Sequence, residues 1–308
     1  MKIVLVAGKR HGVECLKDLI AQGHRVLAIF GRKEDPHEQV DYYTQLQNIA
    51  QAHDIPFHSQ QNLNTPHCQE LLQQLEPELI IVIKWRTIIN KEIYSIPSKG
   101  CVILHDSLLP KYRGFAPLNW AIINGEFETG ATLFFIAEEV DSGPIIAQER
   151  IPISLQHTVL EVEERIVQAY VDLLRENLPA LEQGTAKADP QDETQATYTC
   201  SRTPEDGRID WSRHALEIYN LIRALASPYP GAFAYFGRRK VFIWEADVVE
   251  TQDRYMGRIA GRVIRIDPGV GVQVLTGRGI IRVKEIQLEG QPPQNAAVLV
   301  RSIRAKFE

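Results

Sequence analysis

A histidine followed by two cations, a proline and a glycine is the part of this sequence best suited to chemistry. His105 ends a short apolar run and opens the stretch His105–Gly114, which contains Lys111 and Arg113. An imidazole moves protons near neutral pH, and ammonium and guanidinium groups bind phosphate or pyrophosphate. The stretch predicts a site where an acid/base residue meets an anionic ligand, although a structural histidine beside a solvated basic turn has the same pattern.

An acidic turn further along the chain offers a partner for this histidine. Asp141 lies in the segment Glu138–Gly143, after a run typical of a strand. Spacing alone does not place it beside His105, and three neighbouring acids are also typical of a solvated surface. If the fold brings the two side chains together, the carboxylate would orient the ring and favour its charged form. The pair would then act as a His–Asp acid/base couple.

The elements expected to hold these residues alternate between strands and helices. Apolar runs lie at Lys2–Ala7, Val26–Phe30, Ile55–Phe57, Leu79–Ile83 and Val102–Leu104, separated by segments with helical spacing. This alternation predicts an α/β fold with a doubly wound, mostly parallel sheet. Ligands of such sheets bind at the carboxyl ends of the strands, where His105 is expected.

The 308 residues are enough for about two domains. We expect a catalytic domain over residues 1–183, a polar linker over 184–204, and a smaller domain over 205–308. In the last of these a helix at Ala215–Ala226 precedes short strands separated by glycine-rich turns, which is typical of a small β-barrel.

Several classes of protein are disfavoured. The first strand is followed by Gly8-Lys9-Arg10-His11-Gly12, which is neither a dinucleotide fingerprint nor a P-loop. Four scattered cysteines have no zinc or disulfide spacing, and a net charge of -5 argues against broad binding to nucleic acid. The N-terminal apolar run is too short for a signal sequence, and no run of about 20 apolar residues spans a membrane. We therefore expect a cytoplasmic globular protein that binds a small molecule and holds no metal.

These segments together resemble the 10-formyltetrahydrofolate-dependent formyltransferases. The resemblance covers roughly residues 2–286 and is most specific in His105–Gly114, with the Asp141 turn and the C-terminal barrel in support. Within the family the sequence is most similar to the sugar-nucleotide N-formyltransferases, in particular the enzyme that formylates UDP-4-amino-4-deoxy-L-arabinose. Further segments that carry this likeness are Ala116–Trp120, Arg202–Gly207, Tyr219–Ala224 and Pro228–Phe233.

The resemblance implies an N-formyltransferase that moves a formyl group from 10-formyltetrahydrofolate to the primary amine of a nucleotide-linked amino sugar. His105 would stabilise the oxyanion formed when the amine attacks and would help to move protons, and Asp141 would hold its orientation and charge. The folate pocket would be lined by Arg86, Thr87, Ile88, Val140 and Asp141. The acceptor would lie near Lys111, Arg113, Asn119, Tyr219, Arg223 and Tyr229.

One position departs from the family pattern. The family has an asparagine two residues before the histidine, where this sequence has Ile103, which offers no donor to the formyl oxygen. Two alternatives therefore stay open beside the sugar-nucleotide assignment: a catalytically impaired relative that binds folate or nucleotide, and methionyl-tRNA formyltransferase. The second would need a basic C-terminal domain, and residues 205–308 contain 16 Lys and Arg against 12 Asp and Glu. The acceptor, the pathway and self-association are left open.

Overall fold

The computed structural model describes residues 1–35 and 40–308 of the chain. Contacts divide it into two compact units. The N-terminal unit contains residues 1–118, 128–152 and 162–200, and the C-terminal unit contains residues 119–127, 153–161 and 201–308. Two short internal segments thus belong to the second unit, although the sequence around them gives no sign of this. The predicted boundaries at residues 184 and 204 stay a prediction.

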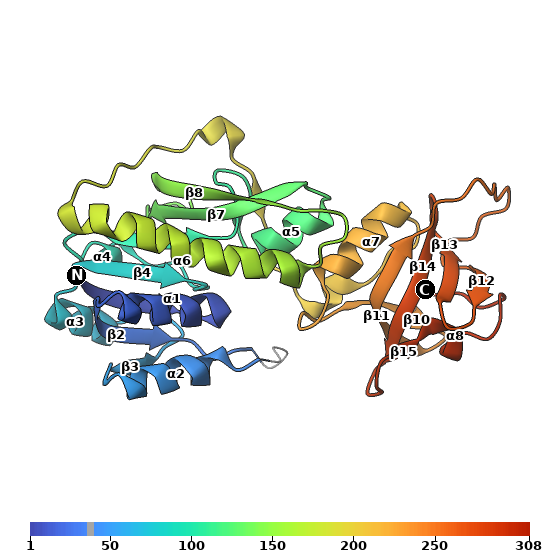
Figure 1. Cartoon of the computed structure of the whole chain (residues 1–308), viewed down its shortest axis with the longest axis horizontal. Coiled ribbons are helices and arrows are strands. Elements are labelled where there is room, and N and C mark those ends of the chain that lie inside the picture. The colour runs from blue at the N-terminus through green and yellow to red at the C-terminus, as the bar shows by residue number, and fades with distance from the viewer. Residues whose placement is uncertain (36–39) are drawn as a thin grey trace. The chain divides into compact units, whose positions relative to one another are not determined.

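A seven-stranded sheet forms the centre of the N-terminal unit (Figure 1). Its order is β3-β2-β1-β4-β5-β7-β8. The strands are β1 (Lys2–Ala7), β2 (Arg25–Gly31), β3 (Phe57–Ser59), β4 (Leu79–Ile83), β5 (Cys101–His105), β7 (Glu128–Phe135) and β8 (Ile145–Pro152). The first five are parallel, and the last two add an antiparallel edge. The sheet confirms the predicted fold class, with β3 lying two residues later than expected.

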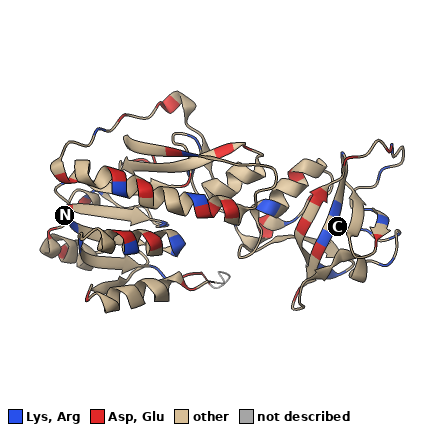
Figure 2. Cartoon of the chain, in the orientation of Figure 1, with Lys and Arg blue, Asp and Glu red and all other residues tan. Residues whose placement is uncertain are grey.

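Helices cover both faces of this sheet because strands buried on both sides alternate their side chains between two cores. The helices of this unit are α1 (Lys9–Ala21), α2 (Tyr42–Ala52), α3 (Pro66–Leu75), α4 (Lys91–Tyr94) and α6 (Val159–Gln183), whereas most of α5 (Pro117–Ile123) belongs to the C-terminal unit. On one face Val4 packs in a cluster with Leu72 of α3 and Ile93 of α4. On the other, α1 and α6 are tied by an ion pair between Asp18 and Arg175. The exposed side of α6 has charges of both signs (Figure 2).

Strand order reverses between β1 and β4, because β2 lies on one side of β1 and β4 on the other. In open parallel sheets, the carboxyl ends of the strands beside such a reversal form the crevice in which ligands bind. β5, which ends at His105, is the strand next to β4. The topology therefore brings His105 to the edge predicted from the sequence.

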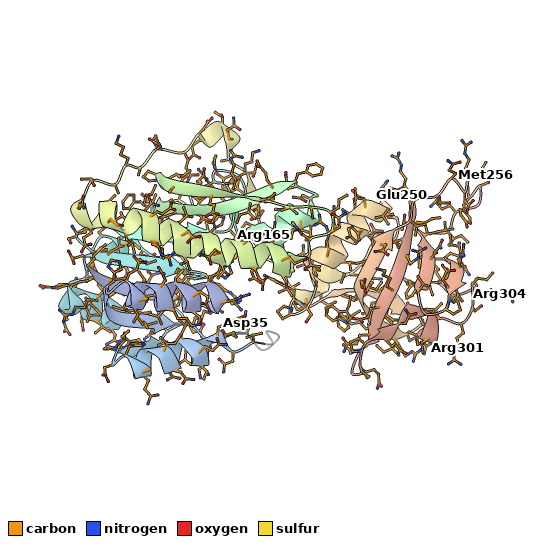
Figure 3. The ribbon with its side chains drawn as sticks, viewed as in Figure 1. Asp35, Arg165, Glu250, Met256, Arg301 and Arg304 are labelled. Atoms are coloured by element: carbon orange, nitrogen blue, oxygen red, sulfur yellow. The ribbon has the colours of Figure 1, made fainter. Side chains whose placement is uncertain are left out.

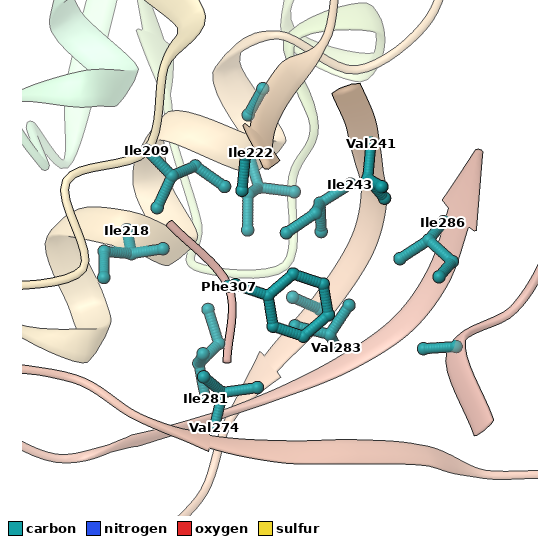
Figure 4. Close-up of a cluster of buried hydrophobic side chains, with 14 of the residues drawn as sticks. Ile209, Ile218, Ile222, Val241, Ile243, Val274, Ile281, Val283, Ile286 and Phe307 are labelled. Atoms are coloured by element: carbon teal, nitrogen blue, oxygen red, sulfur yellow. The ribbon is translucent and has the colours of Figure 1, made fainter. Parts of the chain in front are cut away.

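A mostly antiparallel sheet makes up the C-terminal unit. Its elements are α7 (Ala215–Ala224), β10 (Ala232–Phe236), β11 (Arg239–Val248), β12 (Val263–Asp267), β13 (Gly271–Leu275), β14 (Ile280–Leu288), β15 (Gln294–Asn295) and α8 (Ala296–Leu299). The last residues of the chain pair with both edges of this sheet. Phe307 forms a β-bridge with Phe236 of β10, and Lys306 forms one with Arg262, next to β12. Ile222, Val283 and Phe307 contribute to an apolar core inside the sheet (Figure 4).

No helix within the described ranges has both the length and the apolar character needed to cross a bilayer.

Candidate active site

His105 lies at the end of β5 with only 8% of its surface exposed. Its Nε2 lies 2.9 Å from the carbonyl oxygen of Tyr112, to which it donates. On its other side, Nδ1 lies 3.6 Å from Oδ2 of Asp141. An oxygen atom therefore faces each of the two ring nitrogens, at hydrogen-bond distance for Tyr112 and slightly beyond it for Asp141. The fold thus places together the two residues that the sequence analysis paired.

Asp141 reaches His105 through a loop that starts at the opposite end of β5. β7 runs antiparallel to β5, and its Phe135 pairs with Val102, at the far end of β5 from His105. The loop after β7 must therefore double back for Asp141 to approach the ring. Asp141 adopts a left-handed backbone, which aspartate tolerates better than most residues. Its Oδ2 also accepts a hydrogen bond of 2.7 Å from the backbone N–H of Gly114, which fixes the carboxylate.

The loop that follows His105 is held against β7 by buried hydroxyl groups. Thr132 donates from Oγ1 to the carbonyl of Ser107 (2.6 Å) and accepts from the backbone N–H of Leu109 (3.2 Å). The Gln148 amide donates to both Leu109 O and Thr132 Oγ1. Because the Thr132 hydroxyl is fully buried, its bonds attach the turn that supplies the carbonyl of Tyr112 to the sheet.

Asp106, which follows His105 in the chain, points into a separate buried cluster. Its carboxylate contacts the Lys84 ammonium and accepts a hydrogen bond from the Tyr170 hydroxyl. Burial lowers the pKa of Lys84 to about 8, but the adjacent carboxylate favours the ammonium, and we treat the pair as charged at neutral pH. Burial raises the pKa of Tyr170 well above its usual value, so the phenol stays a donor. The acid next to His105 is therefore committed to Lys84.

Left-handed backbone gathers at the ends of these strands. The structure describes seven non-glycine residues with positive φ. Five of them lie in the turns after β1, β4 and β5 or in the Asp141 loop, namely Lys9, Lys84, Tyr112, Ala116 and Asp141. Such conformations cost energy and persist where the surrounding structure imposes them, often at functional sites.

The residues predicted to line a folate pocket lie in two loops. Arg86, Thr87 and Ile88 follow β4, and Arg86 forms an ion pair with Asp35. Ile88 is 66% exposed and Val140 is 46% exposed. Exposed apolar side chains in these loops suit a flat aromatic ligand, and their contact with folate stays a prediction.

The two cations predicted to meet the acceptor differ strongly in environment. Lys111 is exposed at the turn. Arg113 is fully buried, and its guanidinium makes a bidentate ion pair with Glu193 at 2.7 and 2.8 Å. That contact raises the pKa of Arg113 above its usual value. Arg113 also donates to the side-chain oxygen of Gln191. Lys111 is thus available to a ligand, whereas the Arg113 charge is already paired within the chain.

The remaining predicted acceptor residues belong to the C-terminal unit. Asn119 donates to the carbonyl of Ala224 at 2.8 Å. Arg223, with 4% of its surface exposed, donates to the carbonyls of Ser154 and His157. Burial lowers the pKa of this guanidinium, and the ring of Tyr219 lies below it. These bonds explain why two short internal segments belong to this unit.

Tyr219 and Tyr229 are the other acceptor residues predicted in this unit. Tyr219 donates from its hydroxyl to the carbonyl of Leu155 at 2.8 Å, and both tyrosines are half-buried. Contact of any of the predicted residues with an acceptor stays a prediction.

Comparison with known proteins identifies the family. Residues 1–178 match the family described as Formyl transferase, and residues 202–304 match the Formyl transferase C-terminal domain. The chain therefore belongs to the formyl transferase family. This confirms the resemblance drawn from the sequence and the assignment of the chain as an enzyme of that family.

Solved structures share the fold at low identity. HypX from Aquifex aeolicus, solved with tetrahydrofolic acid, is 19% identical with a TM-score of 0.67; the match covers 98% of this chain and 47% of that one. An N-formyltransferase from Helicobacter canadensis, solved with folinic acid and dTDP-3-aminofucose, is 18% identical with a TM-score of 0.70, covering 92% and 98%. Methionyl-tRNA formyltransferase from Clostridium thermocellum is 20% identical with a TM-score of 0.58, covering 90% and 99%. The chain spans about half the length of HypX.

Proposed function

We propose that this protein transfers the formyl group of 10-formyltetrahydrofolate to the primary amine of a nucleotide-linked amino sugar. The observation that carries the proposal is the approach of Asp141 Oδ2 to His105 Nδ1 at the carboxyl edge of the sheet. An imidazole beside a carboxylate can take up a proton and give it back, and its N–H can stabilise negative charge that develops on an acyl oxygen.

The surroundings of the pair support this role. His105 is almost buried, so water screens its interaction with a developing negative charge less than it would at the surface. Asp141 is fixed by the Gly114 N–H and does not have to be reoriented during the reaction. Lys111 provides an exposed cation on the same loop, which is suited to the diphosphate of a nucleotide sugar.

The test is incubation of the protein with 10-formyltetrahydrofolate and a panel of dTDP- and UDP-linked amino sugars. We expect tetrahydrofolate release and a formylated product by mass spectrometry. The matched control is the corresponding sugar nucleotide with a hydroxyl in place of the amine, which should give neither. Release of tetrahydrofolate at equal rates with both acceptors would contradict an amine acceptor.

The apolar residue at position 103 calls for its own experiment. Ile103 pairs with Val82 and Phe134 and packs partly buried against the cluster that contains Val4. Ile103→Asn introduces an amide two residues before His105. A large gain in formyl transfer would identify a degenerate formyltransferase that has lost a donor. An unchanged rate would show that this site works without a donor at that position.

Methionyl-tRNA is the competing acceptor. It is favoured by the excess of Lys and Arg in residues 205–308 and by exposed Arg301 and Arg304 on the C-terminal unit (Figure 3). Binding to tRNA would weaken steeply with salt because many phosphates are neutralised, whereas a sugar nucleotide has only two. The test is turnover with methionylated initiator tRNA at low and at moderate salt. Turnover that falls by orders of magnitude between the two would show that tRNA, and not a sugar nucleotide, is the acceptor.

A further inference from the structure

The polar segment after α6 crosses the candidate active site. We call residues 189–199 the strap. It begins where Asp189 forms two backbone hydrogen bonds with Ile145, just after the Asp141 loop. It ends as β9 (Tyr198–Thr199), which pairs with β6 (Arg113–Gly114) on the His105 loop. One segment thus touches both loops that carry the catalytic pair.

Gln191 is the side chain of the strap that joins these loops. Its amide nitrogen donates to the carbonyls of Asp141 (2.8 Å) and Gly143 (2.7 Å). Its amide oxygen accepts from Nη2 of Arg113 at 2.8 Å and from Nε at 3.2 Å. All hydrogen-bonding groups of this amide are therefore in use. A single side chain links the backbone of the aspartate turn to the loop of the histidine.

The strap also fixes the group that accepts from His105. The backbone N–H of Tyr112 donates to Thr197 Oγ1 (2.8 Å), and the N–H of Arg113 donates to the Thr197 carbonyl (2.8 Å). The carbonyl of Tyr112 receives the His105 Nε2 hydrogen bond. Thr197 and Gln191 thus hold the acceptor on one side of the ring and the carboxylate on the other.

We infer that Gln191 is a positioning residue for the His105–Asp141 pair. The inference rests on the proposed function for its kinetic consequence, and on the hydrogen bonds alone for its structural one. Displacement of a catalytic group by about 1 Å can cost on the order of a hundredfold in rate. The bonds of Gln191 act against such a displacement of the Asp141 turn.

The experiment compares Gln191→Leu and Gln191→Glu with wild type and with Gln195→Leu. Leucine removes the whole amide, whereas glutamate keeps an acceptor for Arg113 but has no N–H for the Asp141 and Gly143 carbonyls. Gln195 is an exposed glutamine of the same strap that interacts with Asp192, so it is the matched control. We expect both Gln191 variants to lower kcat roughly 10- to 50-fold, with KM changed less than about threefold, and Gln195→Leu to leave both unchanged.

A double-mutant cycle shows whether Gln191 acts through Asp141. In an Asp141→Asn background, Gln191→Leu should lower kcat by less than about twofold, because residues that act as a unit are not additive. A full additional loss would overturn the inference. So would variants with a lower unfolding midpoint and an unchanged kcat per folded molecule, since that result describes a structural role only.

A readout without any acceptor separates this inference from the proposed function. The Gly114 amide proton is bonded to the Asp141 carboxylate, and its hydrogen exchange reports whether that carboxylate is in place. We expect exchange at least tenfold faster in Gln191→Leu than in wild type or Gln195→Leu. If no sugar nucleotide is formylated but this change occurs, the function is wrong and the positioning role stands. Unchanged Gly114 exchange overturns the positioning role.

Discussion

The carboxyl edge of the N-terminal sheet and the inside of the C-terminal sheet are both buried, but they hold different kinds of side chain. Around the end of β5 the buried residues include His105, Asp106, Ser107, Arg113 and Thr132. The core of the C-terminal sheet is a large cluster of apolar side chains, although that unit also buries polar residues, among them Asn220, Arg223, Gln273 and Thr276. Buried polar groups cost free energy unless they are bonded, and each of the five around the end of β5 has a partner. The candidate site is thus a network of buried, hydrogen-bonded polar groups, whereas the C-terminal core is stabilised mainly by apolar packing.

If the two regions have these separate roles, the largest loss of activity should come from a substitution of His105. His105→Ala removes the imidazole and should lower kcat about a thousandfold, within the range for a lost acid/base residue. The free energy of unfolding should fall by only about 1 kcal/mol, because one hydrogen bond to Tyr112 is lost. Steady-state kinetics and urea unfolding measure the two effects. His53→Ala, at an exposed histidine of the same unit, is the control and should change neither. Activity within threefold of wild type would remove His105 from the mechanism.

The opposite pattern is expected in the C-terminal core. Ile281 of β14 is completely buried, and Ile281→Ala should destabilise that unit by about 3 kcal/mol through lost burial and a cavity. Ile281→Val should cost about 1 kcal/mol. Both variants should retain wild-type kcat per folded molecule at temperatures where they stay folded. A fall in kcat that grows with the size of the deletion would show that this core also shapes the reaction.

The parts of the fold that are local in sequence could be predicted from it. Apolar runs identify β1, β4 and β5 because each strand is buried on both faces, and His105 follows from its place at the end of a run. The strand β10 (Ala232–Phe236) is harder to predict, because it directly follows prolines and a glycine, which are typical of turns. Its strand character comes from pairing with β11.

The environment of the site could not be predicted because it depends on distant partners. Arg113 suggested a cation for phosphate, yet Glu193, 80 positions away, neutralises it. Asp106 directly follows His105 in the chain, yet its carboxylate is bound by Lys84, which follows β4, and by Tyr170 of α6. The strap lies within residues 184–204, whose polar composition predicts a linker. The polar composition indicates that these residues form hydrogen bonds, but only the fold shows which groups they bond to.

Asp141 tests whether the two loops of the site act together. Asp141→Asn keeps an oxygen for the Gly114 N–H but loses the charge next to His105. We expect kcat to fall about a hundredfold, less than for His105→Ala, because the imidazole remains. Glu139→Gln, an acid two residues earlier in the same loop, is the matched control and should stay within twofold. Equal losses in the two variants would indicate a general electrostatic effect of the loop and would remove the specific pairing.

The buried cluster around Asp106 should affect the pH dependence of the free energy of unfolding. His11 is fully buried beside Asp106, Lys84 and Tyr170, and its ring nitrogens have no hydrogen-bond partner among the residues that the structure describes. Burial, with Lys84 adding to it, lowers the pKa of His11 well below 6.5. In the unfolded chain this histidine binds a proton as the pH falls through about 6.5, while the folded protein keeps it neutral. The contribution of His11 to the free energy of unfolding is therefore fully present above about pH 6.5 and decreases as the pH falls below that value.

His11→Phe should remove that loss while filling a similar volume. Between about pH 6.5 and pH 5 the free energy of unfolding of wild type should decrease by up to about 1.4 kcal/mol per pH unit more than that of the variant, because one proton is involved. Urea unfolding of both proteins across this range gives the difference, in which groups common to both cancel. Between about pH 7 and 8 the difference should be flat, which serves as an internal control. Parallel curves below pH 6.5 would mean that the folded protein accommodates a charged His11, with Asp106 as its counter-ion.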